Sequence, residues 1–338
     1  MRARAVRILF PLTLALVWVG LSGIDLVPAT ATAQGRGGPP AAAGSPPAAP
    51  GNSVESVPVQ GNIHLIVGAG ANLTVSVGDQ GMLLVDTGER ASADKVIGAL
   101  RQLSPRPLQF IFNTNFRESH TGANEALARF GRRVTDGANA QAVILAHENV
   151  LTRMSGPSGQ PSVRPVQAWP TDTFFAERKE VFFNGEAVQL FYEPGSTDGD
   201  SIVFFRKSDV ISAGEIYSTT AFPMIDVASG GSITGVIEGL NEILELAVPA
   251  NNVEDGTIVI PSSGRLSDEL DVAVYRDMVT IIRDRVQDAI KRKQTLADVK
   301  GDKRLTLEYE GRYGGKGGPW TRDMFVEAVY KSLSATQK

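Results

Sequence analysis

Short apolar runs separated by glycine-containing turns open each half of this chain, and segments with helical periodicity follow them. The first set of predicted strands covers residues 63–67, 73–77 and 82–85. Runs of this length between such turns are typical of consecutive antiparallel strands. Since the pattern of strand runs followed by strand–helix alternation occurs twice, we expect a layered α/β structure with helices outside two sheets.

The remaining predicted elements follow the same logic. In the first half we expect helices over 91–103, 122–130 and 147–154 and strands over 108–113 and 142–146. In the second half, Asn184-Gly185 is a strong hairpin signal between strands 180–183 and 187–192. Further strands are expected over 201–205, 210–212 and 257–260, and helices over 233–246, 270–292 and 322–333. No short-period repeat is visible, which excludes a solenoid or a propeller.

The N-terminus has the order of a secretory signal peptide. Arg2, Arg4 and Arg7 precede an uncharged apolar stretch, residues 8–24, and Ala31-Thr32-Ala33 gives a cleavage signal. We therefore expect residues 1–33 to be removed and the protein to be secreted or periplasmic. A retained membrane anchor is the alternative, because the apolar stretch is nearly long enough to span a bilayer. The cleavage signal favours removal, which would leave no stable membrane span.

Two further segments follow the predicted signal peptide. Residues 34–54 are mostly Pro, Ala and Gly and are predicted to be a disordered linker, whereas residues 55–338 have the composition of a globular domain. Removing residues 1–33 takes away three arginines and one aspartate, which moves the net charge from −4 to −6. A mildly acidic chain without an extended basic patch argues against nucleic acid as a partner. With no cysteine, the fold depends on a packed core.

Polar residues gather where four predicted strands end, at residues 85–88, 113–124, 194–200 and 260–264. Loops of this kind carry function in α/β sheets. Together with GAGANLTVSVGDQGMLLVDTG, HTGANE, AHENV, DGDSIVFF and FPMIDVASGGSI, these segments resemble the metallo-β-lactamase superfamily from about Gly61 to the C-terminus. The resemblance implies a four-layer αββα sandwich of two similar halves, with a one- or two-metal hydrolytic site at the sheet edges.

Most metal-ligand positions implied by the resemblance are substituted. In the family's T-H-x-H-x-D-H segment, asparagine, arginine and serine stand at the first three ligand positions, and only the last histidine is retained. Serines replace two later histidines, and a glutamate replaces the bridging aspartate. In chain order, the candidate pocket residues at these positions are Asn115, Arg117, Ser119, His120, Ser196, Glu215 and Ser263.

The residue counts point the same way. Catalytic zinc needs about three protein ligands, and this chain has three histidines and no cysteine. His64 lies in a predicted strand, and His147 at a strand–helix boundary remote from the four loops, where a cap or core role is expected. We therefore expect no zinc and no other cofactor, with His120 and Glu215 as weak metal candidates. A hard ion such as Mg²⁺ is an alternative, through Glu118, Glu215, Asp198 and Asp200.

Arg117 would project into a cavity that holds divalent cations in the family. We hypothesise that it pairs with Glu215 and replaces the metal charge. Alternatively, Arg117 points to solvent, or it receives a small anionic ligand. Asp86 is expected to brace the neighbouring loop. A serine nucleophile with His120 as its base is a further alternative, through Ser119, Ser196 or Ser263.

These observations predict an exported metallo-β-lactamase-like protein that lacks the usual dinuclear zinc site. A non-catalytic ligand-binding or scaffolding role is the leading hypothesis. A divergent hydrolase of ester or lactam-type bonds, with a non-standard metal or a metal-free site, is the rival. A structural envelope protein tethered through residues 34–54 is a third alternative.

Overall fold

The first sheet contains seven strands in sequence order. The computed structural model describes residues 53–133, 140–157, 159–251, 255–314 and 318–335, all within one compact unit. The strands are β1 (Glu55–Pro58), β2 (Ile63–Val67), β3 (Leu73–Gly78), β4 (Gly81–Val85), β5 (Leu108–Asn113), β6 (Val143–His147) and β7 (Asp172–Phe174). Strands β1 to β4 form an antiparallel meander, and β4 to β7 run parallel.

The second sheet contains five strands in the order β12-β11-β10-β9-β8. Their bounds are β8 (Arg178–Phe183), β9 (Glu186–Tyr192), β10 (Ser201–Phe205), β11 (Val210–Ser212) and β12 (Ile258–Ile260). Only β11 and β12 pair in parallel. The predicted hairpin joins β8 to β9, with φ of 52° at Asn184 and 78° at Gly185. Positive φ at both turn positions matches the twist of the flanking strands, which explains the Asn-Gly pair.

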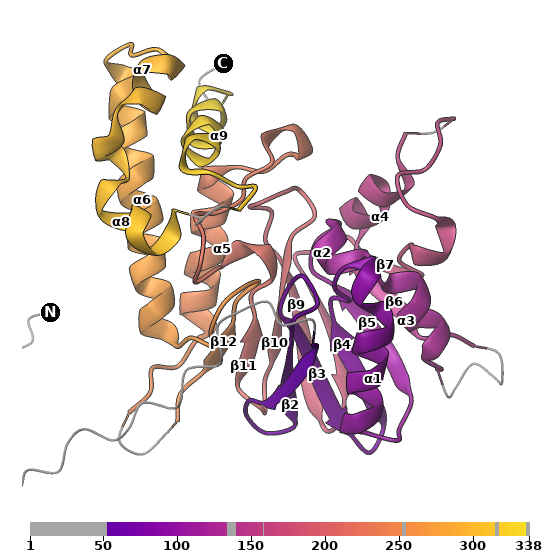
Figure 1. Ribbon diagram of the computed structural model, residues 1–338. Helices are drawn as coiled ribbons and strands as arrows, with labels where there is room; N and C mark the ends of the chain where they lie inside the picture. Colours follow the sequence, from indigo (N-terminus) through magenta and orange to yellow (C-terminus); the bar gives the residue numbers. More distant parts are fainter. Residues whose placement is uncertain (1–52, 134–139, 158, 252–254, 315–317, 336–338) are drawn as a thin grey trace, which may run out of the picture. The chain divides into compact units, whose positions relative to one another are not determined.

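Helices cover the outer face of each sheet (Figure 1). The first group comprises α1 (Ala93–Leu103), α2 (Glu118–Thr121), α3 (Asn124–Phe130) and α4 (Glu148–Ser155). The second comprises α5 (Ile233–Leu246), α6 (Glu269–Lys291), α7 (Leu296–Gly301), α8 (Leu307–Tyr313) and α9 (Arg322–Ala335). Single-turn helices η1 (Arg90–Ser92), η3 (Val166–Ala168), η4 (Gly214–Ile216), η5 (Val227–Ser229) and η6 (Lys303–Leu305) lie in the connections. The predicted αββα layering is confirmed.

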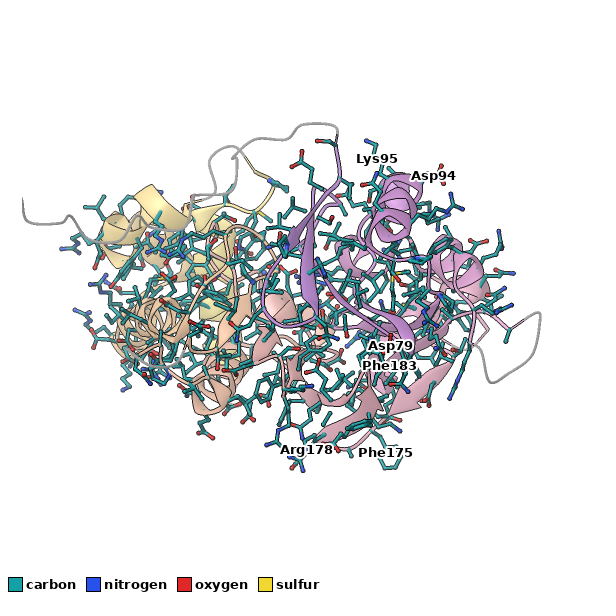
Figure 2. The ribbon with its side chains drawn as sticks, turned by 90° about the horizontal axis from the view of Figure 1, so that it is seen from below. Asp79, Asp94, Lys95, Phe175, Arg178 and Phe183 are labelled. Atoms are coloured by element: carbon teal, nitrogen blue, oxygen red, sulfur yellow. The ribbon has the colours of Figure 1, made fainter. Side chains whose placement is uncertain are left out.

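Alternation along β4 shows how the layers are built. Leu83 and Val85 face the second sheet, whereas Met82 and Leu84 face α1 and α3. Every residue of β4 is buried, because a strand covered on both faces has no polar side. Helix α1 is amphipathic, with Asp94 and Lys95 pointing outward in the view from below (Figure 2). Two outer cores and one core between the sheets result.

Some elements differ from the sequence prediction. Strands β1 and β7 and helices α7 and α8 were not predicted, since they are short and lack clear periodicity. The helix expected over 122–130 corresponds to α3, which begins at Asn124, and the four-residue α2 just before this range was not predicted. The predicted signal peptide and nearly all of the predicted linker lie outside the described residues. Within the described residues, no helix is both long and apolar enough to cross a bilayer.

Candidate functional site at the carboxyl ends of the strands

Residues from both sheets meet above the carboxyl ends of the parallel strands. Asp86 follows β4, the segment with Asn115 and His120 follows β5, and Glu215 follows β11. Parallel neighbours end at the same edge, so their following loops converge there. Three of these side chains, from two different sheets, form one continuous set of contacts.

Asp86 is the brace of this edge. Its backbone has a φ of 61°, which is uncommon for a residue with a side chain. Its two carboxylate oxygens accept hydrogen bonds from the Thr114 backbone N–H at 2.8 Å and the Thr114 hydroxyl at 2.7 Å. Oδ2 also lies 2.7 Å from His120 Nδ1. The predicted bracing of the neighbouring loop is therefore confirmed, and it ties β4 to the loop after β5.

His120 is held between two carboxylates. Its ring is fully buried, with Nδ1 2.7 Å from Asp86 Oδ2 and Nε2 2.7 Å from Glu215 Oε2. Burial alone would lower the pKa of His120, but Asp86 and Glu215 together outweigh burial and raise the pKa to about 10. At neutral pH the ring is an imidazolium that donates both N–H groups. It has no lone pair for a metal ion or for a substrate proton.

Glu215 is brought to His120 by the glycine before it. Gly214 has a φ of 53°, and a Cβ there would lie 2.8 Å from the Thr114 hydroxyl oxygen. Only glycine allows this close approach of η4 to the loop after β5. Burial would raise the pKa of Glu215, but the hydrogen bond from His120 and the charges of His120 and Arg117 lower it. The carboxylate is therefore ionised at neutral pH.

Arg117 completes the set. Its Nη1 lies 3.6 Å from Glu215 Oε1, with the two side chains 17% and 14% exposed, and its Nη2 donates to the Met224 carbonyl at 3.4 Å. The predicted pairing of Arg117 with Glu215 is confirmed, and the solvent-facing alternative is wrong. In space the order is Asp86, His120, Glu215 and Arg117, which we call the charge chain. Its charges alternate and sum to zero, the condition under which buried charges are tolerated.

The first substituted ligand position belongs to a different network. The Asn115 amide donates to Asp200 and, at 3.2 Å, to the Thr197 hydroxyl, and its Oδ1 accepts from the Arg117 backbone N–H at 2.8 Å. Asp200 also accepts from the backbone N–H groups of Thr197 and Gly195. Burial raises the pKa of Asp200 to about 6, and the bonds from Thr197 and Asn115 oppose that rise. Asn115 thus fixes the loop between β9 and β10.

The three substituted serines lie apart from this network. Ser196 donates to the Met224 carbonyl. Ser263 bonds the hydroxyls of Ser218 at 2.9 Å and Thr220 at 3.0 Å. Ser119 is half-buried on α2. Both nitrogens of His120 bond carboxylates, and its pKa is far above 7, so the predicted alternative of a serine nucleophile with His120 as base has no support in this geometry.

The donor set does not fit a divalent metal ion. Within the described ranges, no group of three or more His, Cys, Asp or Glu side chains is arranged to hold one. The four carboxylates considered for Mg²⁺ each have another partner. Glu118 pairs with Arg164, Asp198 with Arg153, Asp200 with Asn115 and Glu215 with His120. Arg117 adds a fixed cation to the same space.

Solved structures of known proteins share this architecture. A metallo-β-lactamase from Pontibacter korlensis aligns with a TM-score of 0.53 and 13% identity over 68% of this chain and 99% of its own. The DIM-1 metallo-β-lactamase gives 0.51 and 16% over 68% and 97%. The chain has the metallo-β-lactamase fold. The stereoselective inverting sec-alkylsulfatase Pisa1 from Pseudomonas sp. aligns at 0.62 and 13% over 82% of this chain, which spans 50% of that enzyme.

In contrast to the structure, the sequence matches no protein-family model and no curated protein. Identities of this size establish the fold alone. Three members of the charge chain, Arg117, His120 and Glu215, stand at positions that the resemblance identifies as ligand positions.

His147 caps a helix as predicted, but it lies closer to the four loops than predicted. Its Nδ1 accepts from the Asn149 backbone N–H at 3.3 Å and so caps α4. Its ring stacks on Tyr192 at a centroid distance of 3.7 Å, and the Tyr192 hydroxyl donates to the Asp198 carbonyl at 3.0 Å. The prediction that His147 is remote from the four loops is therefore wrong. Strand β6 ends beside β5 at the same edge, which places its last residue next to the 194–200 loop.

Several residues of the site were not predicted. Thr114 connects the charge chain to the backbone, Ser218 and Trp320 line a cavity beside Glu215, and Thr220 bonds to the Ser218 hydroxyl. Hydroxyl residues are too common in loops to carry a signal. Trp320 precedes α9, more than 100 residues along the chain from Glu215, so nothing in the local sequence connects the two.

Proposed function

We propose that this protein is an exported binding protein on the metallo-β-lactamase fold that works without metal and does not hydrolyse its ligand. The observation that carries the proposal is the bonding of His120. Both of its nitrogens are used by carboxylates, so the one retained ligand histidine cannot coordinate an ion without losing Asp86 or Glu215. Loss of either would leave a buried charge unpaired, which opposes metal entry.

The chemistry expected of a hydrolase is also missing from the charge chain. A metal site of this class generates a hydroxide nucleophile and polarises the bond to be cleaved. His120, held as an imidazolium, cannot act as a general base at neutral pH, and the Arg117 cation is already paired with Glu215. What the site can offer is hydrogen bonding and shape. Binding of a small molecule close to Arg117 and Glu215 is the function we assign.

The test is a metal analysis coupled to activity assays on the same preparation. We expect purified protein to carry far less than one zinc per chain before and after incubation with zinc, and to leave chromogenic lactam, ester and alkyl sulfate substrates intact. A matched control restores the family's ligands through Asn115→His, Arg117→His, Ser119→Asp, Ser196→His, Glu215→Asp and Ser263→His. Stoichiometric zinc in the unchanged protein, with hydrolysis that a chelator abolishes, would overturn the proposal.

Export is tested separately. The N-terminal arginines, the apolar stretch at residues 8–24 and the Ala31-Thr32-Ala33 site support cleavage after Ala33. Expression in a Gram-negative host, followed by fractionation and N-terminal sequencing, should give a periplasmic or secreted chain that begins at Gln34. A full-length chain that stays with the membrane fraction would support the retained anchor.

A further inference from the structure

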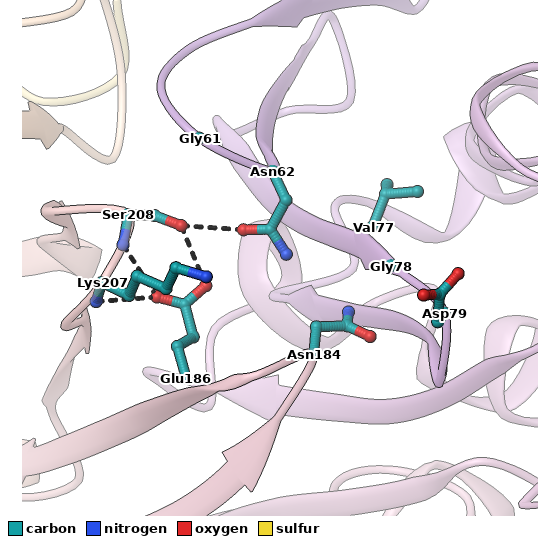
Figure 3. Close-up of a pocket in the computed structure, with 9 residues that line it drawn as sticks. All are labelled: Gly61, Asn62, Val77, Gly78, Asp79, Asn184, Glu186, Lys207 and Ser208. Atoms are coloured by element: carbon teal, nitrogen blue, oxygen red, sulfur yellow. Dashed lines mark hydrogen bonds between the residues drawn. The ribbon is translucent and has the colours of Figure 1, made fainter.

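A small cavity opens directly beside the charge chain. Its volume is about 80 Å³, and Glu215, Ser218, Ser263, Phe222, Met224 and Trp320 are among the residues that line it. Since one water occupies roughly 30 Å³ of liquid, this space holds two or three waters or an organic group of a few heavy atoms. The cavity therefore suits the end group of a ligand. It differs from a larger hollow of about 410 Å³ (Figure 3), where the Asn62 and Asn184 amides donate to the Ser76 hydroxyl and Glu186 accepts from the Ser208 backbone N–H.

Ser218 and Ser263 line the cavity, and they form a triangle of hydroxyl groups with Thr220, an exposed residue outside the lining. Ser218, Thr220 and Ser263 lie 2.9 to 3.3 Å from one another, and either atom of each pair can be the donor. Gly264 makes the triangle possible, because a Cβ there would lie 1.9 Å from the Thr219 hydroxyl, and its φ is 99°. A closed ring of three hydroxyls uses one donor and one acceptor from each, which leaves lone pairs free and lets the donors reorient.

Two further groups leave hydrogen-bonding capacity at the cavity. Trp320 Nε1 is buried and bonds no other atom of the described residues. Glu215 bonds His120 through Oε2, while its Oε1 lies 3.6 Å from Arg117 Nη1, beyond hydrogen-bond reach. A buried donor without a partner is unfavourable, so an acceptor at Trp320 is favoured. A group that accepts a hydrogen bond from Trp320 Nε1 and donates one to Glu215 Oε1 would therefore suit the cavity.

The charge balance selects the kind of ligand. The charges of the charge chain sum to zero, so the cavity has no excess charge of one sign beside it. An anion would face the Glu215 carboxylate at the wall, and a cation would face Arg117 and His120 just behind it. Phe222 and Met224 supply an apolar surface opposite the hydroxyls. Neutral molecules with hydroxyl edges and C–H faces match both surfaces.

We propose that this cavity binds the hydroxyl-bearing end of a neutral small molecule, a polyol or a sugar, through Trp320, Glu215, Ser218 and Ser263. The proposal rests on the proposed function only in assigning ligand binding to this side of the charge chain. It replaces the expectation of an anionic ligand at Arg117, because Glu215 already neutralises that cation.

The full chain contains its own reporter. Trp320 Nε1 has no hydrogen-bond partner among the described residues, whereas Trp169 Nε1 donates to the Arg164 carbonyl at 2.9 Å and serves as an internal reference. In indole N–H NMR spectra of chelator-treated protein, with Trp320 assigned from a Trp320→Phe variant, we titrate xylitol, acetate and ethylammonium. Xylitol should shift the Trp320 signal saturably and leave Trp169 unchanged, and the two ions should not.

Two variants make the result specific. Ser263→Ala removes one hydroxyl of the triangle and should weaken xylitol binding about fivefold, the effect of one hydrogen bond. Ser155→Ala, whose hydroxyl bonds only within α4, should leave it unchanged. The proposal is overturned if xylitol gives no saturable shift, if acetate or ethylammonium binds more tightly, or if both variants behave alike. Zinc content and hydrolysis are read independently, so failure of the proposed function remains distinguishable.

Discussion

His120 donates to Glu215 across the two halves of the sandwich, with 2.7 Å between Nε2 and Oε2 and 95 residues between them in sequence. His120 belongs to α2, in the layer of the first sheet, and Glu215 to η4 after β11 of the second. The site is therefore a bond between halves as well as a local arrangement of charges. Its energetics can be tested one charge at a time.

Replacing His120 with Gln should destabilise the protein strongly. The change removes the cation between Asp86 and Glu215 and leaves two buried carboxylates facing each other. Breaking a buried ion pair costs about 3–5 kcal/mol, and we expect a loss of that size in the free energy of unfolding measured with urea. His64→Gln, at a half-buried position of β2, is the matched control and should cost below about 1 kcal/mol. Equal losses in the two variants would contradict the role of the charge chain.

The pH dependence of stability should carry the signature of His120. Its folded pKa is raised from 6.5 to about 10, so the stabilisation is fully present below pH 6.5 and is lost as pH rises toward 10. Between pH 7.5 and 9.5 we expect the free energy of unfolding to fall by on the order of 1 kcal/mol per pH unit. Urea midpoints across this range measure it. In the His120→Gln variant the slope should flatten, and an unchanged slope would assign it to other groups.

Arg117 and Glu215 should be energetically coupled. A double-mutant cycle with Arg117→Met and Glu215→Gln isolates their interaction from the bond of Glu215 to His120. The pair is 3.6 Å apart and mostly buried, so a coupling of about 1 kcal/mol is expected. The same cycle with Arg129 and Glu125, an exposed pair within α3, is the control and should give well under half of that value. Additive effects at Arg117 and Glu215 would show that the two charges do not interact.

Glu193 should destabilise the protein when it ionises. Burial, followed by the charges of Glu242 and Glu238, raises its pKa from 4.5 to about 7. For an acid whose folded pKa is raised, stability falls as pH rises from 4.5 through 7. Glu193→Gln should therefore raise the melting temperature at pH 8 and leave it nearly unchanged at pH 4.5. A similar increase at both pH values would point to packing rather than charge.

The sequence predicted the layers well because their signal is local and repeated. Apolar runs of five or six residues coincide with β2, β5 and β10, and the 3.6-residue period coincides with α5. Strand β7 escaped prediction because its three residues begin with the polar Asp172 and Thr173, and its pairing partner β6 lies across a long connection. The resemblance supplied the arrangement of the sheets, which no local pattern could have given.

Some contacts of the candidate site were likewise predictable from the sequence, and others were not. The pairing of Arg117 with Glu215 was predictable, because the resemblance placed both at ligand positions of one cavity. The bonds of Asn115 to Asp200 and of Ser263 to Ser218 were not, since they depend on where each side chain points once two loops have crossed. For His147, the predicted role was right and the predicted distance was wrong, because the adjacency of β5 and β6 is a property of the sheet.

Because the charge chain joins segments that are distant in sequence, it should affect the rate of unfolding as well as the stability. His120 and Arg117 meet Glu215 only when segments about 100 residues apart have both folded, so we expect these bonds to form late. Interactions absent from the folding transition state slow unfolding and barely change the folding rate. The charge chain would then lengthen the lifetime of the native state, the quantity that governs irreversible inactivation by heat.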